Sequence, residues 1–83
     1  MSKIYPIVKK HIDKYDFLHL LKNGAPSDEY DHESKKISDS IINESSIEEI
    51  ASVIASVMST DFGYDYIKPE NFIDIAKKIK SDL

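Results

Sequence analysis

Apolar residues recur at helical spacing, three or four positions apart, along most of the chain. The first of these stripes covers residues 4–15, where Pro6 is tolerated because it lies in the opening turn. Further stripes cover residues 47–58 and 72–83, and Pro69 suits the first position of the last helix. The three stripes consist of Ile4, Ile7, Val8, His11, Ile12 and Tyr15, of Ile47, Ile50, Ala51, Ile54, Val57 and Met58, and of Phe72, Ile75, Ala76, Ile79 and Leu83.

Capping residues between the stripes predict where helices begin and end. Ser46 followed by Glu49 is a capping box, and Gly63 closes the helix that this box opens. Asp16 is the expected cap of a short helix over residues 17–21.

A glycine and a proline separate that short helix from the next one. Gly24 enters the left-handed conformation that ends a helix, and Pro26 prevents the residue before it from being helical. Ser27 is then the natural N-cap of a helix that runs to Asn43. One face of this helix carries Tyr30, Ser34, Ile37 and Ile41, and the opposite face carries Asp28, Asp31, His32 and Asp39. These carboxylates, together with Glu33, are expected to point to solvent or to a partner.

The pattern predicts an all-α fold, a small bundle of four longer helices and one short helix around an Ile-rich core. The 83 residues are expected to form a single helical domain over residues 1–83. No apolar run approaches the ~20 residues of a membrane span, and the first six residues lack the apolar region of an export signal. There are no cysteines, which is compatible with a reducing compartment. We expect a cytoplasmic protein that does not enter a membrane.

Charge is distributed unevenly along the chain. Residues 1–22 contain five Lys and two acidic residues, residues 27–74 contain three Lys and twelve acidic residues, and residues 75–83 contain three Lys and one acidic residue. All eleven basic residues are Lys, so the arginine that dominates base and phosphate recognition is missing. Direct binding of nucleic acid is therefore not expected.

The candidate chemistry is sparse. His11 lies on an apolar face, where a packed histidine with a hydrogen-bond partner is the commoner outcome than a ligand or base. No paired-histidine zinc motif or calcium-loop spacing is present, and no serine elbow, phosphate loop or thiol appears. Exposed carboxylates such as Asp28 and Asp31 lack the burial that separates the pKa values of an acid and a base. We expect no catalysis, no cofactor and no metal.

Two further features bear on binding. Phe62, Tyr64 and Tyr66 lie beside Asp65, and they either pin this loop to the core or offer aromatic anchors for a protein contact. Ile42 points away from the apolar stripe of its helix, which is ordinary for an isolated residue.

The segment GAPSDEYD at residues 24–31 is the most distinctive in the chain, and Glu33 follows it directly. With Asp16 before it and the helix of residues 47–58 after it, this segment resembles a small bacterial family of unknown function whose signature is GAPxDEYD. Members are short, all-helical and without assigned catalysis, and similar proteins are encoded beside polymorphic toxins of contact-dependent growth inhibition.

This resemblance implies an immunity protein that binds a cognate protein toxin, a basic nuclease domain, and neutralises it by steric and electrostatic block. An acidic protein gains fast association with such a partner by electrostatic steering. The expected contact residues are Asp28, Asp31, Glu33, Asp39, Tyr64, Asp65 and Tyr66. The free protein is expected to be a monomer or a weak homodimer.

Two alternatives stay open at this point. The GAPxDEYD motif is equally compatible with a structural role, with Tyr30 in the core and Asp31 at a helix start or in a tertiary hydrogen bond. The rival function is a housekeeping protein–protein interaction module without catalysis.

Overall fold

The computed structural model describes residues 3–65 and 67–83, and each regular element in these ranges is helical. This confirms the predicted all-α class. The elements are α1 (Ile4–Tyr15), α2 (Asp31–Ser40), α3 (Ile47–Asp61), the 3₁₀ turn η1 (Pro69–Phe72) and α4 (Ile73–Asp82).

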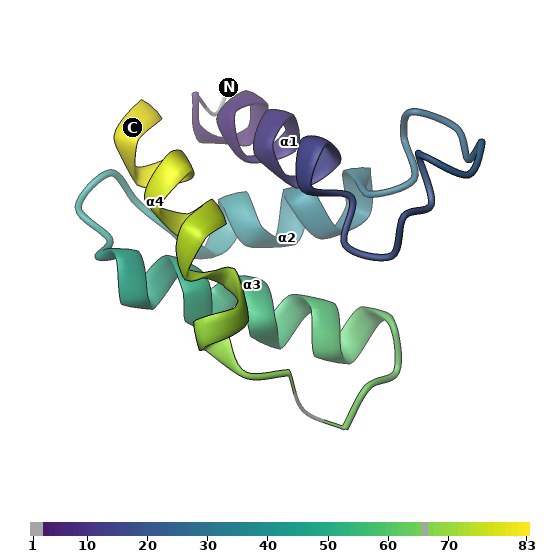
Figure 1. The fold of residues 1–83 in the computed structure, drawn as a ribbon. Coiled ribbons are helices and arrows are strands. Elements are labelled where there is room, and N and C mark those ends of the chain that lie inside the picture. Colours follow the sequence, from purple (N-terminus) through teal and green to yellow (C-terminus); the bar gives the residue numbers. More distant parts are fainter. Residues whose placement is uncertain (1–2, 66) are drawn as a thin grey trace.

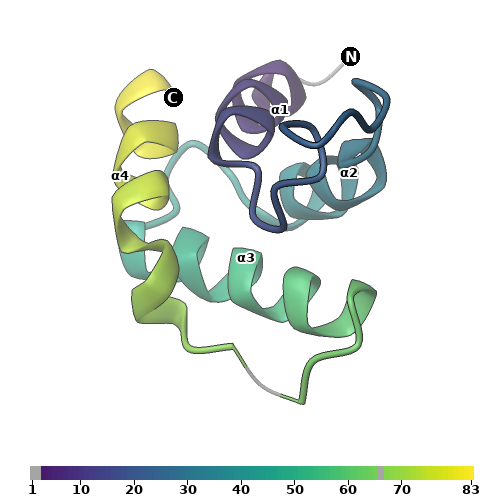
Figure 2. The ribbon, with the colours of Figure 1, turned by 45° about the vertical axis from the view of Figure 1, so that its right-hand side comes forward.

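The four α-helices form a closed circuit of neighbours. α1 packs against α2 and α4, and α3 packs against the same two helices and against η1. Figure 1 shows α3 crossing beneath α2, and Figure 2 shows α1 and α2 in the corner between α3 and α4. The start of α1 and the end of α4 lie at the same end of the molecule (Figure 1).

One hydrophobic core joins all four helices, and eight of its fifteen buried members are isoleucines, as predicted. Burial of apolar surface is the main favourable term in folding. The members are Val8, Ile12, Tyr30, Ile37, Ile41, Ile50, Ala51, Ile54, Ala55, Met58, Ile67, Phe72, Ile75, Ala76 and Ile79.

The short helix predicted over residues 17–21 is absent, and the chain forms a series of turns there instead. Asp16 ends α1 in the left-handed conformation, with φ 52°, so it does not begin a new helix. His19 also has a positive φ, of 56°, which a right-handed helix does not allow. Asp16 is therefore the C-cap of α1, and the prediction that it is the N-cap of a second helix is wrong.

The helix predicted over residues 27–43 is shorter than expected at both ends. Residues 27–30 form a turn, and α2 begins at Asp31 without a side-chain cap, so Ser27 is not its N-cap. At the other end Ile41 is extended, with φ −124° and ψ 160°.

The ends of α3 agree with the prediction. Ser46 and Glu49 form both bonds of the capping box, at 3.1 Å and 2.8 Å. Gly63 has a φ of 76°, and the amide of Tyr64 returns to the Ser59 carbonyl at 3.0 Å, which is a Schellman closure.

Candidate interaction surfaces

The GAPSDEYD segment organises the turns between α1 and α2 through a buried pair. The Tyr30 side chain is fully buried, and its hydroxyl donates to Asp16 Oδ1 at 2.7 Å and accepts from the Leu18 amide at 3.0 Å. The Asp16 carboxylate also accepts from the amides of Leu21 and Lys22, at 3.1 Å and 2.9 Å. Tyr30 thus serves the core, as the structural interpretation of the motif requires.

These bonds set the charge state of the pair. Burial works to raise the pKa of Asp16, but the hydrogen bonds from Tyr30, Lys22 and Leu21 outweigh it and lower the pKa. Burial and the bond to the Asp16 carboxylate raise the pKa of the Tyr30 hydroxyl. At neutral pH an ionised Asp16 therefore holds a protonated Tyr30.

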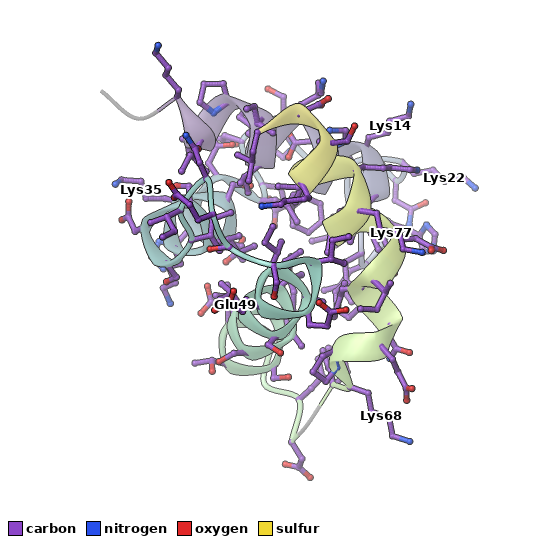
Figure 3. All side chains as sticks on the ribbon, turned by 90° about the vertical axis from the view of Figure 1, so that its left-hand side faces the viewer. Lys14, Lys22, Lys35, Glu49, Lys68 and Lys77 are labelled. Carbon is purple, nitrogen blue, oxygen red and sulfur yellow. The ribbon has the colours of Figure 1, made fainter. Side chains whose placement is uncertain are left out.

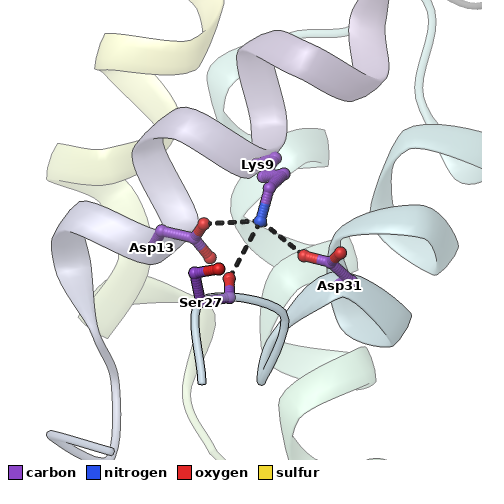
Figure 4. Close-up of polar contacts among 4 residues, drawn as sticks. All are labelled: Lys9, Asp13, Ser27 and Asp31. Atoms are coloured by element: carbon purple, nitrogen blue, oxygen red, sulfur yellow. Dashed lines mark hydrogen bonds and ion pairs between the residues drawn. The ribbon is translucent and has the colours of Figure 1, made fainter. Parts of the chain in front are cut away.

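Asp31 takes part in a second internal contact, centred on Lys9. Lys9 Nζ lies 2.8 Å from Asp13 Oδ2, 2.5 Å from Asp31 Oδ1 and 3.1 Å from the Ser27 carbonyl (Figure 4). Hydrogen bonds from Lys9 to the two carboxylates raise the pKa of Lys9 above its ordinary value. Asp31, predicted to face solvent, is half-buried, and its carboxylate ties the start of α2 to α1.

Glu33 is buried, with only 6% of its surface exposed, so the prediction that it faces solvent is wrong. Its carboxyl group meets Asp61 at the end of α3, which also binds Lys36 Nζ at 2.6 Å and lies 3.9 Å from the His32 ring. Ser34 and Ile37 are buried on the predicted face of the helix, and Glu33 adjoins this face and turns toward α3.

The pKa values of the two carboxyl groups of this pair shift in opposite directions. Burial raises the pKa of Glu33, and the hydrogen bond to Asp61 raises it further. Burial also works to raise the pKa of Asp61, but hydrogen bonds from Lys36 and Glu33 lower it overall. When the pair holds one proton, that proton therefore lies on Glu33, and Asp61 is the carboxylate.

The other predicted contact residues do not converge on one patch. Asp28 is exposed in the turn before α2, and Asp39 is exposed in its last turn, where it pairs with Lys35 at 3.0 Å. Eight residues of α2, about 12 Å of helix, lie between the turn that carries Asp28 and Asp39 itself. Asp65 is exposed on a different segment, the loop after α3. Tyr66 lies outside the described residues.

Tyr64 joins an aromatic cluster at the end of the bundle. Its ring meets Phe17 edge-on with centroids 6.1 Å apart, and Phe17 also packs against Phe62 and Phe72. Phe62 in turn contacts the buried Tyr30 at 6.2 Å. The loop after α3 is pinned to the core by these rings, yet 48% of Tyr64 stays exposed.

The turn of residues 41–46, between α2 and α3, carries an exposed apolar side chain that was not among the predicted contact residues. Ile42 is 60% exposed, the most of any exposed large apolar residue in the described ranges. Beside it runs a shallow groove between α2 and α3, lined by Ser40, Ile41, Ser45, Glu48, Glu49, Ser52 and Val53. The departure of Ile42 from the apolar stripe was the only sequence signal of this surface.

Lysines gather on the side of α1 and α4. Figure 3 shows Lys14, Lys22 and Lys77 on one side of the molecule and Lys35 on the other. A groove on this basic side is lined by His11, Lys14, Tyr15, Asn71, Asp74, Ile75 and Lys78.

His11 is packed as expected, because its Nε2 lies 2.7 Å from Asp82 Oδ2. Hydrogen bonds from Lys10 and His11 lower the pKa of Asp82.

Within the described residues, no group of three or more histidine, aspartate or glutamate side chains is arranged to hold a metal ion. None of the described helices has the length and apolar content needed to cross a membrane. No family model, curated protein or solved structure matches the chain.

Proposed function

We propose that this chain is an immunity protein that binds a cognate bacterial toxin domain, a basic nuclease, and neutralises it by covering its surface. It acts in the cytoplasm as a stoichiometric binder, without catalysis, cofactor or direct contact with nucleic acid. The resemblance of residues 24–33 to the GAPxDEYD family supports the proposal, and so does the distribution of charge over the fold.

The observation that carries the proposal is the spatial separation of charge. Most of the acidic residues between positions 27 and 74 remain on the surface of α2, α3 and the turns beside them, and Glu33 is the one that is buried. Six of the eleven lysines lie on α1 or α4. A basic partner is therefore attracted to one side of this molecule and repelled by the other.

Such a charge distribution suits fast capture of a basic toxin. Complementary potentials raise association rates and orient the two proteins before contact, while apolar contacts at the interface supply most of the affinity. Neutralisation then follows from occupancy, because a covered nuclease surface has no access to its substrate.

The direct test is co-expression with an inactive form of the toxin domain encoded by the adjacent gene. We expect a one-to-one complex on size-exclusion chromatography at micromolar concentration, and loss of nuclease activity when the active toxin is titrated with this protein. An unrelated basic protein such as cytochrome c is the control. Failure to form a complex, or complex formation with cytochrome c of equal strength, would refute the proposal.

A second function is favoured by one observation: the acidic side and the basic groove of α1 and α4 are complementary to each other. Copies of the chain that associate head to tail would form an interaction module unrelated to toxins. Sedimentation equilibrium of the protein alone separates the two functions, because only head-to-tail association predicts a mass that rises with concentration beyond that of a dimer. The absence of a toxin gene beside this one would favour it as well.

A further inference from the structure

The turn of residues 41–46 holds an exposed apolar side chain in a fixed position. The Ile42 amide donates to Ser45 Oγ at 2.9 Å, and the Ser45 amide donates back to the Ile42 carbonyl at 3.0 Å. Beneath the turn, Ile41 is buried in the core. Lys80 of α4 donates to the Asn43 carbonyl at 2.9 Å, so the turn is tied to a third helix as well.

This anchoring removes a cost that most surface loops pay on binding. Ordering a loop and its side chains at an interface opposes association, and a loop that is already ordered avoids much of that loss. Of the exposed large apolar residues described, Tyr15 and Tyr64 each pack against neighbouring rings. Ile42 is the aliphatic member of this group, and it lies on the turn that carries the exposed Glu44.

Two exposed carboxylates, Glu44 and Glu48, outnumber the one ammonium group, Lys80, that the turn itself binds. Glu44 and Glu48 are exposed and enter no ion pair among the described residues, whereas Asp39 is paired with Lys35. Glu48 lies on the groove between α2 and α3 that borders the turn. The side chains free to bind a partner here are thus one aliphatic group and two negative groups.

We infer that the turn of residues 41–46 is the contact site for the partner: Ile42 enters an apolar pocket, and Glu44 and Glu48 pair with lysines or arginines at its rim. This inference rests on the proposed function and names the surface that carries it out. The occupant is a basic protein surface, because unpaired carboxylates beside the anchor would repel an acidic one. Burial of an apolar side chain within a polar rim is the usual arrangement of an interface hot spot.

The experiment uses the inactive toxin domain of the adjacent gene and measures binding by isothermal titration calorimetry and by stopped-flow kinetics. Ile42→Ala is expected to weaken binding about tenfold or more, mainly through faster dissociation. Tyr15→Ala is the matched control at another exposed apolar position, away from the turn and outside the predicted contact residues, and it is expected to change binding less than about threefold. Thermal unfolding of each variant verifies that the fold is kept, as expected for an exposed position.

A pair of charge reversals separates local contacts from overall charge. Glu48→Lys and Glu70→Lys change the net charge equally, and both residues are exposed, but Glu70 lies on η1, away from the turn. Glu48→Lys is expected to weaken binding by at least about tenfold more than Glu70→Lys in the same buffer. Equal losses would show that only long-range attraction is at work and would overturn the inference.

The outcomes also distinguish this inference from the proposed function. If the wild-type protein does not bind the toxin domain, the proposed function fails, and this contact site fails with it. If the wild type binds and Ile42→Ala binds equally well, the function stands and the site is wrong. If instead Ile42→Ala abolishes a self-association of the wild type, the occupant is a second copy of the chain, and the inferred partner is wrong.

Discussion

At the scale of single residues, polar side chains withdrawn from solvent hold the irregular part of this fold. Residues 16–30 contain no regular element, yet the amides of Leu18, Leu21 and Lys22 all find partners on Asp16 or Tyr30. A buried donor or acceptor that loses its partner costs more than the bond itself contributes. The Tyr30 hydroxyl, which both donates and accepts, is therefore the most sensitive atom of this segment.

Tyr30→Phe is expected to lower the free energy of unfolding by about 1–3 kcal/mol, because the Asp16 carboxylate and the Leu18 amide lose a shared partner. Urea denaturation followed by circular dichroism measures the change. Tyr64→Phe removes a hydroxyl from a half-exposed ring and should stay within about 0.5 kcal/mol of the wild type. Equal effects of the two substitutions would contradict a special role for the buried pair.

The pair of Glu33 and Asp61 predicts a stability that depends on pH in two directions. The pKa of Glu33 is raised above 4.5 in the folded protein, so the folded state retains a proton that the unfolded chain releases. Stability from this group is complete below pH 4.5 and declines as pH rises through the folded pKa. The pKa of Asp61 is lowered below 3.8, so its contribution is present above pH 3.8 and is lost as pH falls.

Glu33→Gln tests this directly, because an amide donates to Asp61 at any pH and has no proton to release. The variant should equal the wild type near pH 4.5 and become the more stable of the two as pH rises toward 8. Urea denaturation at several pH values measures the difference, and Glu44→Gln is the control at an exposed position. A difference between Glu33→Gln and the wild type that does not vary with pH would contradict the protonated state of Glu33.

At the scale of elements, α2 and α3 begin by different means. α3 has a complete capping box, whereas α2 has no side-chain cap and instead places Asp31 and Glu33 in its first turn. Asp31 also pairs with Lys9 of α1. The start of α3 is thus stabilised locally, and the start of α2 is stabilised by contacts with the rest of the fold.

Ser46→Ala should reduce the free energy of unfolding by about 0.5–2 kcal/mol, because the Glu49 amide at the start of α3 loses its acceptor. Ser56→Ala, on an exposed position inside the same helix, should be neutral or slightly stabilising because alanine is the better helix former. Differential scanning calorimetry compares the two variants with the wild type. A loss of stability from Ser56→Ala as large as that from Ser46→Ala would argue against the cap.

This difference explains which elements could be predicted from the sequence. The boundaries of α3 depend on residues within five positions of each other, and these were predicted correctly. The turn of residues 27–30 depends on contacts with Asp16 and Lys9, so the local signal of a serine before two acids was misleading. Glu33 was misplaced for the same reason, since its partner Asp61 lies 28 positions further on, at the end of α3.

At the scale of the whole molecule, the acidic residues fall into two groups with different tasks. Asp31 and Asp13 hold Lys9, and Asp61 holds Lys36, so these carboxylates stabilise the fold. Asp39, by contrast, is exposed and makes only an exposed pair with Lys35, which contributes little to stability. Some carboxylates of this segment thus stabilise the fold, and others remain available for the proposed association.

Charge reversal at Asp31 and at Asp39 should separate the two tasks. Asp31→Lys places a second ammonium beside Lys9 and a positive charge in the first turn of α2, and it is expected to destabilise the fold by about 1–2 kcal/mol. Asp39→Lys should leave the unfolding temperature almost unchanged but slow association with a basic toxin domain several-fold in about 10 mM salt, where charges act over about 30 Å. In about 1 M salt this range shrinks to about 3 Å, and the difference in association rate should disappear. Stopped-flow kinetics at both salt concentrations measure the association rates, and thermal unfolding measures the stability of each variant. A slowing by Asp39→Lys that persists in high salt would mean that Asp39 acts by direct contact and not by steering.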